Sequence, residues 1–84
     1  MSENRPEKPP VHLSVIIPAF NEERRIGPTL ESIIAYLEKQ DYTWEILVID
    51  DGSSDQTVAV SEEACGGLEP AAFRIHRQPH NMGK

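Results

Sequence analysis

The apolar residues of this chain gather in three short runs, and stretches with helical spacing lie between them. The most uniform run is ILVI at residues 46–49, which ends abruptly in Asp50 and Asp51. A run this short and this uniformly apolar predicts a strand buried on both faces, as in a parallel sheet. The run LSVII at residues 13–17 predicts an earlier strand. Pro18 should end that strand, because proline has no N–H to donate to a neighbouring strand.

Two helices are predicted between the strands. In the first, apolar residues recur at positions 26, 30, 33, 34 and 37, a spacing that places them on one helical face. Proline is well tolerated at a first helical position, so the regular helix is expected over residues 28–39, after a turn at 22–26. The second helix is expected over residues 56–64, with Asp55 or Ser54 as its cap.

A third strand is expected at residues 72–76, where the letters AFRIH alternate apolar and polar. This alternation is typical of a strand with one solvated face and favours the edge of a sheet. The order strand, helix, strand, helix, strand predicts an α/β fold with three parallel strands and right-handed crossovers. The first two strands should be adjacent, with the third beyond the second. Residues 1–12 are polar and proline-rich, so we expect a disordered tail before the domain.

Composition narrows the possible functions. The chain has 84 residues and a net charge of -6, which argues against nonspecific binding to nucleic acid or to anionic lipid. No apolar stretch approaches the roughly 20 residues of a transmembrane helix, and the polar, proline-rich start does not resemble a signal peptide. Cys65 is the single cysteine, so no internal disulfide can form. These features favour a cytoplasmic location.

The loops exclude several common kinds of site. The first strand is followed by PAFNE, which lacks the glycines of a dinucleotide-binding fingerprint. The pair Gly83-Lys84 lacks the upstream glycine spacing of a phosphate-binding loop. No histidine has a second histidine or cysteine at metal-ligand spacing. What remains is a pair of carboxylates at the end of a buried strand, the usual place for a binding site in open α/β sheets.

Three segments together resemble the opening of a family 2 glycosyltransferase of the GT-A fold: LSVIIPAFNEE, EILVIDDGSSDQT and HNMGK. Their order and spacing match from residue 13 to residue 84, and RRIGPTLESIIAYLEKQ is most similar to the dolichyl- or polyprenyl-phosphate glucosyltransferase and mannosyltransferase branch. The resemblance implies that residues 13–84 form the N-terminal, nucleotide-binding half of a Rossmann-like GT-A domain in a longer enzyme. That enzyme would transfer a hexose from a UDP- or GDP-sugar to a polyprenyl or dolichyl phosphate.

The resemblance assigns six residues to nucleotide binding: Pro18, Phe20, Glu22, Asp50, Asp51 and Lys84. Pro18 and Phe20 would line the nucleobase pocket, and Glu22 would lie near the nucleoside. Asp51 would accept a hydrogen bond from a base N–H, since a carboxylate is an acceptor-only group. Asp50 would support Asp51, and Lys84 would lie near the base or the diphosphate, where a point charge is suitable.

Each of these roles has a simpler alternative. Asp50 or Asp51 could cap the second helix and satisfy the turn that follows the strand. Phe20 could be a core residue at a strand end, and Glu22 could cap the first helix. For Asn21, capping of the first helix is the preferred interpretation. Trp44 is expected to pack against the first helix.

The family's acidic metal-binding motif, its general base and its acceptor-binding region are expected beyond residue 84. Mg²⁺ or Mn²⁺ would serve the complete enzyme, at the cytoplasmic face of a membrane, while this chain alone should bind no metal and be inactive. Its partners would be a nucleotide-sugar donor and a lipid-phosphate acceptor. Two alternatives stay open: a noncatalytic nucleotide-binding or interaction module, and another nucleotide-sugar enzyme that shares this first half.

Overall fold

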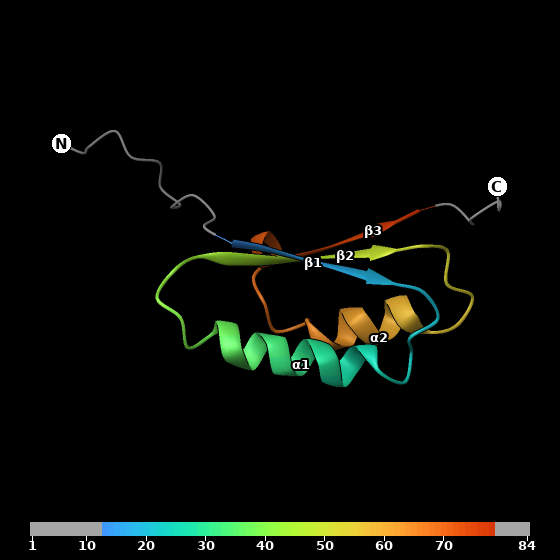
Figure 1. Ribbon diagram of the computed structural model, residues 1–84, viewed down its shortest axis with the longest axis horizontal. Coiled ribbons are helices and arrows are strands. Elements are labelled where there is room, and N and C mark those ends of the chain that lie inside the picture. Colours follow the sequence, from blue (N-terminus) through green and yellow to red (C-terminus); the bar gives the residue numbers. More distant parts are fainter. Residues whose placement is uncertain (1–12, 79–84) are drawn as a thin grey trace.

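A computed structural model describes residues 13–78, in which strands and helices alternate along the chain (Figure 1). The elements are β1 (Leu13–Ala19), α1 (Ile26–Leu37), β2 (Trp44–Asp50), α2 (Thr57–Ala64), the short 3-10 helix η2 (Pro70–Ala72) and β3 (Phe73–Arg77). The expected tail at residues 1–12 and the expected site residue Lys84 lie outside the described residues.

The sheet has the order β1-β2-β3, and both strand pairs are parallel. This confirms the predicted α/β fold, with the first two strands adjacent and the third beyond the second. In the observed register Ala19 pairs with Asp50, and Asp50 pairs with Arg77. The carboxyl ends of the three strands are therefore level with one another, and the loops that follow them begin at one edge of the sheet.

Among the described residues, both helices lie on the same face of the sheet (Figure 1). In β2, Ile46, Val48 and Asp50 are buried, whereas Leu47 and Ile49 are only partly buried. The prediction that this strand is buried on both faces is therefore wrong for the described part of the chain. Its even-numbered side chains face the helices, and its odd-numbered apolar side chains face the side that α1 and α2 leave uncovered.

Pro18 lies inside β1 and does not end it, which corrects the prediction. Leu13 N–H donates to Thr43 C=O, and Ala19 C=O accepts from Asp51 N–H. The odd-numbered residues of β1 therefore direct their backbone groups toward β2. The backbone of Pro18 is directed toward the opposite edge, so its missing N–H removes no bond to β2.

The helix α1 begins at Ile26, two residues earlier than predicted. The turn before it is closed by hydrogen bonds from the N–H groups of Arg25 and Ile26 to Glu22 C=O. Pro28 is still within the first helical turn, where backbone N–H groups have no helical partner, so the helix accommodates it. Leu30 and Leu37 are fully buried in one core cluster with Ile46 and Val48 of β2, and partly buried Trp44 packs against that core.

Candidate functional site

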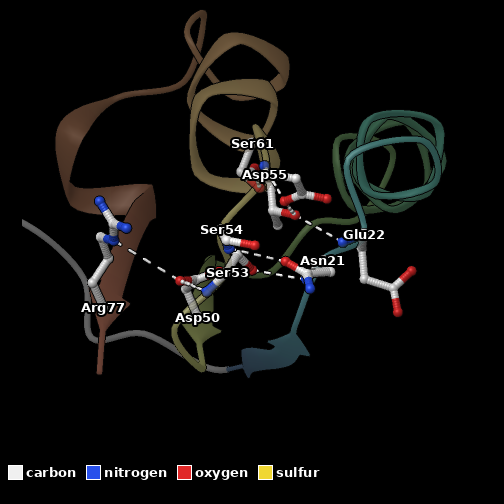
Figure 2. Close-up of polar contacts among 9 residues, drawn as sticks. Asn21, Glu22, Asp50, Ser53, Ser54, Asp55, Ser61 and Arg77 are labelled. Atoms are coloured by element: carbon white, nitrogen blue, oxygen red, sulfur yellow. Dashed lines mark hydrogen bonds and ion pairs between the residues drawn. The ribbon is translucent and has the colours of Figure 1, made fainter. Parts of the chain in front are cut away.

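The carboxyl ends of β1 and β2 continue into two neighbouring loops, at residues 20–25 and 51–56 (Figure 2). Ala19 C=O accepts a hydrogen bond of 2.9 Å from Asp51 N–H, so the two loops start side by side. The Phe20 side chain is 50% exposed, and Asp51 is partly exposed. Within residues 13–78, no hydrogen bond or ion pair reaches the Asp51 carboxylate. Both side chains are therefore available to a ligand at this edge of the sheet.

Asp50, by contrast, is fully buried, and both of its carboxylate oxygens accept hydrogen bonds. Its Oδ2 accepts from Ser53 N–H at 3.1 Å, and its Oδ1 accepts from the Ser53 hydroxyl at 2.6 Å (Figure 2). Arg77 Nε lies 3.9 Å from Oδ2, and Gln78 N–H donates to Asp50 C=O. Of the two interpretations left open for Asp50, these contacts favour the one in which it satisfies the turn after β2.

Asn21 joins the two loops instead of capping α1, so that prediction is wrong. Its N–H donates to Ser53 Oγ at 2.8 Å, and its Oδ1 accepts from Ser54 N–H at 3.0 Å. Asn21 has a φ of 51°, in the left-handed region that Asn tolerates better than most residues. The side-chain oxygen that could have capped α1 is used by a residue of the opposite loop.

A second group of contacts links the same loops closer to the helices. Glu22 N–H donates to Thr57 Oγ1 at 2.7 Å, and Glu23 N–H donates to Asp55 Oδ2 at 3.3 Å. In return, Gln56 N–H donates to Glu23 Oε1 at 2.8 Å. Asp55 Oδ1 also accepts from the N–H of Thr57, the first residue of α2. The N-cap residue of α2 is Gln56, and not Asp55 or Ser54 as predicted. Asp55 nevertheless accepts from the first residue of α2 and connects that helix to the β1–α1 loop.

These hydrogen bonds set the acidity of Asp55. Burial alone would raise the pKa of its carboxyl group, but hydrogen bonds from Thr57 and Glu23 outweigh that effect and lower the pKa below its usual value. A carboxylate with a lowered folded-state pKa stabilises the fold above its unfolded-state pKa of about 3.9. That contribution is lost as the pH falls through the lower folded-state value.

We expect the variant Thr57→Val to raise the pKa of Asp55, because it removes the hydroxyl that donates to Oδ1. The titration can be followed by carbon-13 NMR of the Asp55 carboxyl group. Thr57→Ser keeps the hydroxyl and should leave the pKa low. An equal pKa in Thr57→Val and the parent chain would contradict the assigned cause.

Glu22 lies one turn away from the strand ends, and its side chain pairs with exposed Arg25 at 3.4 Å. Such exposed pairs contribute little to stability. A shallow depression of about 220 Å³ lies here, lined by Asn21, Glu22, Glu23, Arg24, Arg25 and Asp55. Phe20 and Asp51 do not line it. The depression is therefore distinct from the area in which the expected base-reading residues lie.

The structure thus brings four expected site residues to one edge of the sheet: Pro18, Phe20, Asp50 and Asp51. Three structural partners of this edge are not predicted by the sequence pattern, namely Ser53, Thr57 and Arg77, and the role of Asn21 differs from the predicted one. The small polar letters of GSSDQT indicate a loop rich in side-chain hydrogen bonds. They do not reveal that the partners lie in a loop about thirty residues earlier.

In the described part of the chain, no group of three or more His, Cys, Asp or Glu side chains is placed to hold a metal ion. The carboxylates of Asp50 and Asp55 already accept hydrogen bonds from their own loops. No helix among residues 13–78 has the length and apolar character needed to cross a membrane.

Three parallel strands joined by helical crossovers, with loops that meet at the carboxyl edge of the sheet, define an open α/β domain. Residues 14–84 match the family model for glycosyl transferase family 2, and the chain belongs to this family. It is 45% identical over 83 residues to dolichyl-phosphate beta-glucosyltransferase ALG5D of Trichomonas vaginalis, covering 93% of this chain and 25% of that protein. It is 35% identical over 83 residues to the human dolichyl-phosphate beta-glucosyltransferase, covering 93% and 26%.

Two further proteins resemble this chain, one in sequence and one in structure. The dodecaprenyl-phosphate galacturonate synthase of Rhizobium johnstonii is 36% identical over 74 residues, covering 88% of this chain and 22% of that protein. The structure resembles a mannosyltransferase from Pyrobaculum calidifontis, solved with GDP-Man and Mn²⁺, with a TM-score of 0.61 and 25% identity. That match covers 86% of this chain and 21% of the other. The fold is the N-terminal half of a GT-A domain, and the chain spans about a quarter of the length of these relatives.

Proposed function

We propose that this chain supplies the nucleotide-binding half of a glycosyltransferase that moves a hexose from a UDP- or GDP-sugar to a polyprenyl or dolichyl phosphate. The observation that carries the proposal is that exposed Phe20 and the available carboxylate of Asp51 directly follow the level ends of the neighbouring strands β1 and β2. The names of the dolichyl-phosphate and dodecaprenyl-phosphate relatives support the acceptor class. The GDP-Man in the mannosyltransferase structure supports the donor class.

Asp51 and Asp50 have different roles at this edge of the sheet. Asp51 accepts a hydrogen bond from a base N–H, because its oxygens have no partner among residues 13–78. Asp50 is fully buried and so cannot reach a ligand, and it supports Asp51 by accepting the hydrogen bonds that hold the turn. The exposed ring of Phe20 offers an apolar face to the base or ribose, next to Pro18. Glu22 and Lys84 complete the proposed set, near the nucleoside and near the base or diphosphate.

The metal of the proposed enzyme has no fitting residues in the described part of this chain. The Mn²⁺ in the related mannosyltransferase structure supports a divalent ion, Mg²⁺ or Mn²⁺, in the complete enzyme. When bound, such an ion would neutralise the charge of the leaving diphosphate. The residues described here contribute binding and orientation of the nucleotide, and the complete enzyme would act at the cytoplasmic face of a membrane.

The change Asp51→Ala in the complete enzyme is expected to weaken nucleotide binding by about 1–3 kcal/mol, the scale of one unpaired buried donor. The free energy of unfolding should hardly change, because the Asp51 carboxylate has no hydrogen-bond or ion-pair partner within residues 13–78. Calorimetric titration with UDP and with GDP measures the effect and identifies the preferred base. Unchanged affinity for both nucleotides would remove Asp51 from the site.

The 84-residue chain alone is expected to transfer no sugar, because its described carboxylates form no metal-binding group. The assay is hexose transfer from UDP-glucose and GDP-mannose to a short polyprenyl phosphate with Mg²⁺ or Mn²⁺. Turnover above the enzyme-free blank would contradict this expectation. In the complete protein, nucleotide binding without any transfer would favour the noncatalytic binding module instead.

A further inference from the structure

We infer that Ser53 and Asn21 are positioning residues that hold Phe20 and Asp51 at the separation a nucleotide requires. The inference rests on the proposed function, because it assigns these two residues to the same nucleotide site. It adds residues that would act without touching the nucleotide, through a chain of contacts that joins the ends of all three strands (Figure 2).

The chain of contacts runs across the whole carboxyl edge of the sheet. At one end Arg77, the last residue of β3, pairs with the buried carboxylate of Asp50, the last residue of β2. Asp50 accepts from the N–H and the hydroxyl of Ser53. The Ser53 oxygen in turn accepts from Asn21 N–H, in the loop after β1, and the Asn21 side chain accepts from Ser54 N–H.

The burial of Ser53 shows that it acts through its neighbours. The residue is 7% exposed, and its hydroxyl donates to Asp50 while its oxygen accepts from Asn21. The only hydroxyl proton is thereby committed. A nucleotide placed between Phe20 and Asp51 would find no accessible donor on Ser53, so any effect of this residue on affinity must pass through the geometry of the loops.

The backbone conformation of Asn21 also supports a positioning role. Its positive φ is a state that residues other than glycine adopt at a cost, and such states persist where the surroundings hold them. Here the holding contacts are the two hydrogen bonds to Ser53 and Ser54. Phe20 directly precedes Asn21 in the chain, so the direction in which its ring projects depends on that backbone state.

Loss of these contacts would loosen the β1–α1 loop against the β2–α2 loop beside the site, while the hydrogen bonds of Glu22 and Glu23 closer to the helices remain. The ring of Phe20 and the carboxylate of Asp51 would then sample several separations, and nucleotide binding would have to restore the productive one. Ordering of this kind weakens affinity even when no contact with the ligand is lost. The expected signature is a loss of affinity out of proportion to the loss of stability.

The test uses the complete protein that contains this chain, with its unchanged sequence as the parent and UDP and GDP as probes in calorimetric titrations. Two variants each remove one hydrogen bond between the loops. Ser53→Ala removes the oxygen that accepts from Asn21 N–H, and Asn21→Gly removes the side-chain oxygen that accepts from Ser54 N–H while glycine tolerates the positive φ. Each should raise the Kd of the preferred nucleotide about five- to tenfold, the scale of one hydrogen bond. The double variant should lose less affinity than the sum of the two single losses, because the two hydrogen bonds hold the same pair of loops together.

Two controls separate positioning from a general loss of stability. Ser53→Thr keeps the hydroxyl and should restore most of the affinity. Ile33→Val trims a partly buried core residue of α1 and should lower the melting temperature without changing the Kd. If Ser53→Ala does not fold, the exposed position of Asn21 lets Asn21→Gly decide the question alone.

The possible failures are distinguishable. If the parent chain binds neither nucleotide, the proposed function is overturned and the positioning role falls with it. If the parent chain binds but Ser53→Ala and Asn21→Gly bind equally well, only the positioning role is overturned. A Kd raised equally in Ile33→Val, or not recovered in Ser53→Thr, also overturns the positioning role.

Discussion

Replacement of Asp50 by alanine is expected to lower the free energy of unfolding by about 3 kcal/mol or more, since it leaves buried donors without an acceptor. Asp50 is completely buried at the end of β2. Its two oxygens accept from the N–H and the hydroxyl of Ser53, and its charge faces Arg77. Alanine would leave these groups beside an apolar methyl group that cannot satisfy them.

The size of this effect is large relative to the stability available. The free energy of unfolding of natural domains is about 5–15 kcal/mol, and a domain this small is at the lower end of that range. Asp50→Ala should therefore bring the chain close to unfolding at room temperature. Urea denaturation followed by circular dichroism measures the change.

The neighbouring acid provides the matched control. Asp51→Ala removes an identical side chain one position later, where no partner reaches the carboxylate within residues 13–78. We expect a change of no more than about 0.5 kcal/mol, as is usual for surface substitutions. Equal losses in Asp50→Ala and Asp51→Ala would contradict the division of roles between the two acids.

The contrast between Asp50 and Asp51 was partly contained in the sequence. Side chains alternate along a strand, so Asp50 shares a face with Ile46 and Val48, and Asp51 follows where the strand has ended. Which of the two faces the helices would cover was not decided by that alternation. Because all residues of the run 46–49 are apolar, the pattern predicts burial on both faces, but within residues 13–78 the helices cover only one.

Local signals predicted the elements well and the connections between the loops poorly. The helical spacing from Ile26 to Leu37 and the alternation in β3 depend on neighbours within a few residues. The bonds from Asn21 to Ser53 and from Glu22 to Thr57 join residues more than thirty positions apart. No propensity links such residues, since several polar partners in either loop could satisfy the same groups. The left-handed backbone of Asn21 has the same origin, because it is held from the opposite loop.

Pro18 shows how a correct rule can lead to a wrong boundary. Proline does remove a donor, but only half of the backbone groups of an edge strand are needed by its neighbour. In β1 the needed groups belong to odd-numbered residues, as the bonds of Leu13 and Ala19 show. The backbone groups of even-numbered residues point the opposite way, so the N–H and C=O groups of Ser14 and Ile16 are directed away from β2, toward the outer edge of the strand.

We expect the purified 84-residue chain to self-associate through this outer edge of β1. Within residues 13–78, no strand pairs with β1 on the side away from β2. Ile16 is 55% exposed and Leu13 is 39% exposed on this strand. An open, apolar edge strand offers a template for pairing with a second chain.

The variant Ile16→Lys should restore a monomer, because a charged side chain on an edge strand opposes pairing with another chain. Ala35→Lys adds the same charge at an exposed position of α1, away from the edge, and should leave the association unchanged. Sedimentation velocity over a range of concentrations measures the mass of each variant. A parent chain that remains monomeric throughout would contradict association at the edge. Either lysine reduces the magnitude of the net charge of -6 and so weakens the repulsion between chains, which means that net charge cannot explain a loss of association. Equal relief by both lysines would contradict association at the edge of β1.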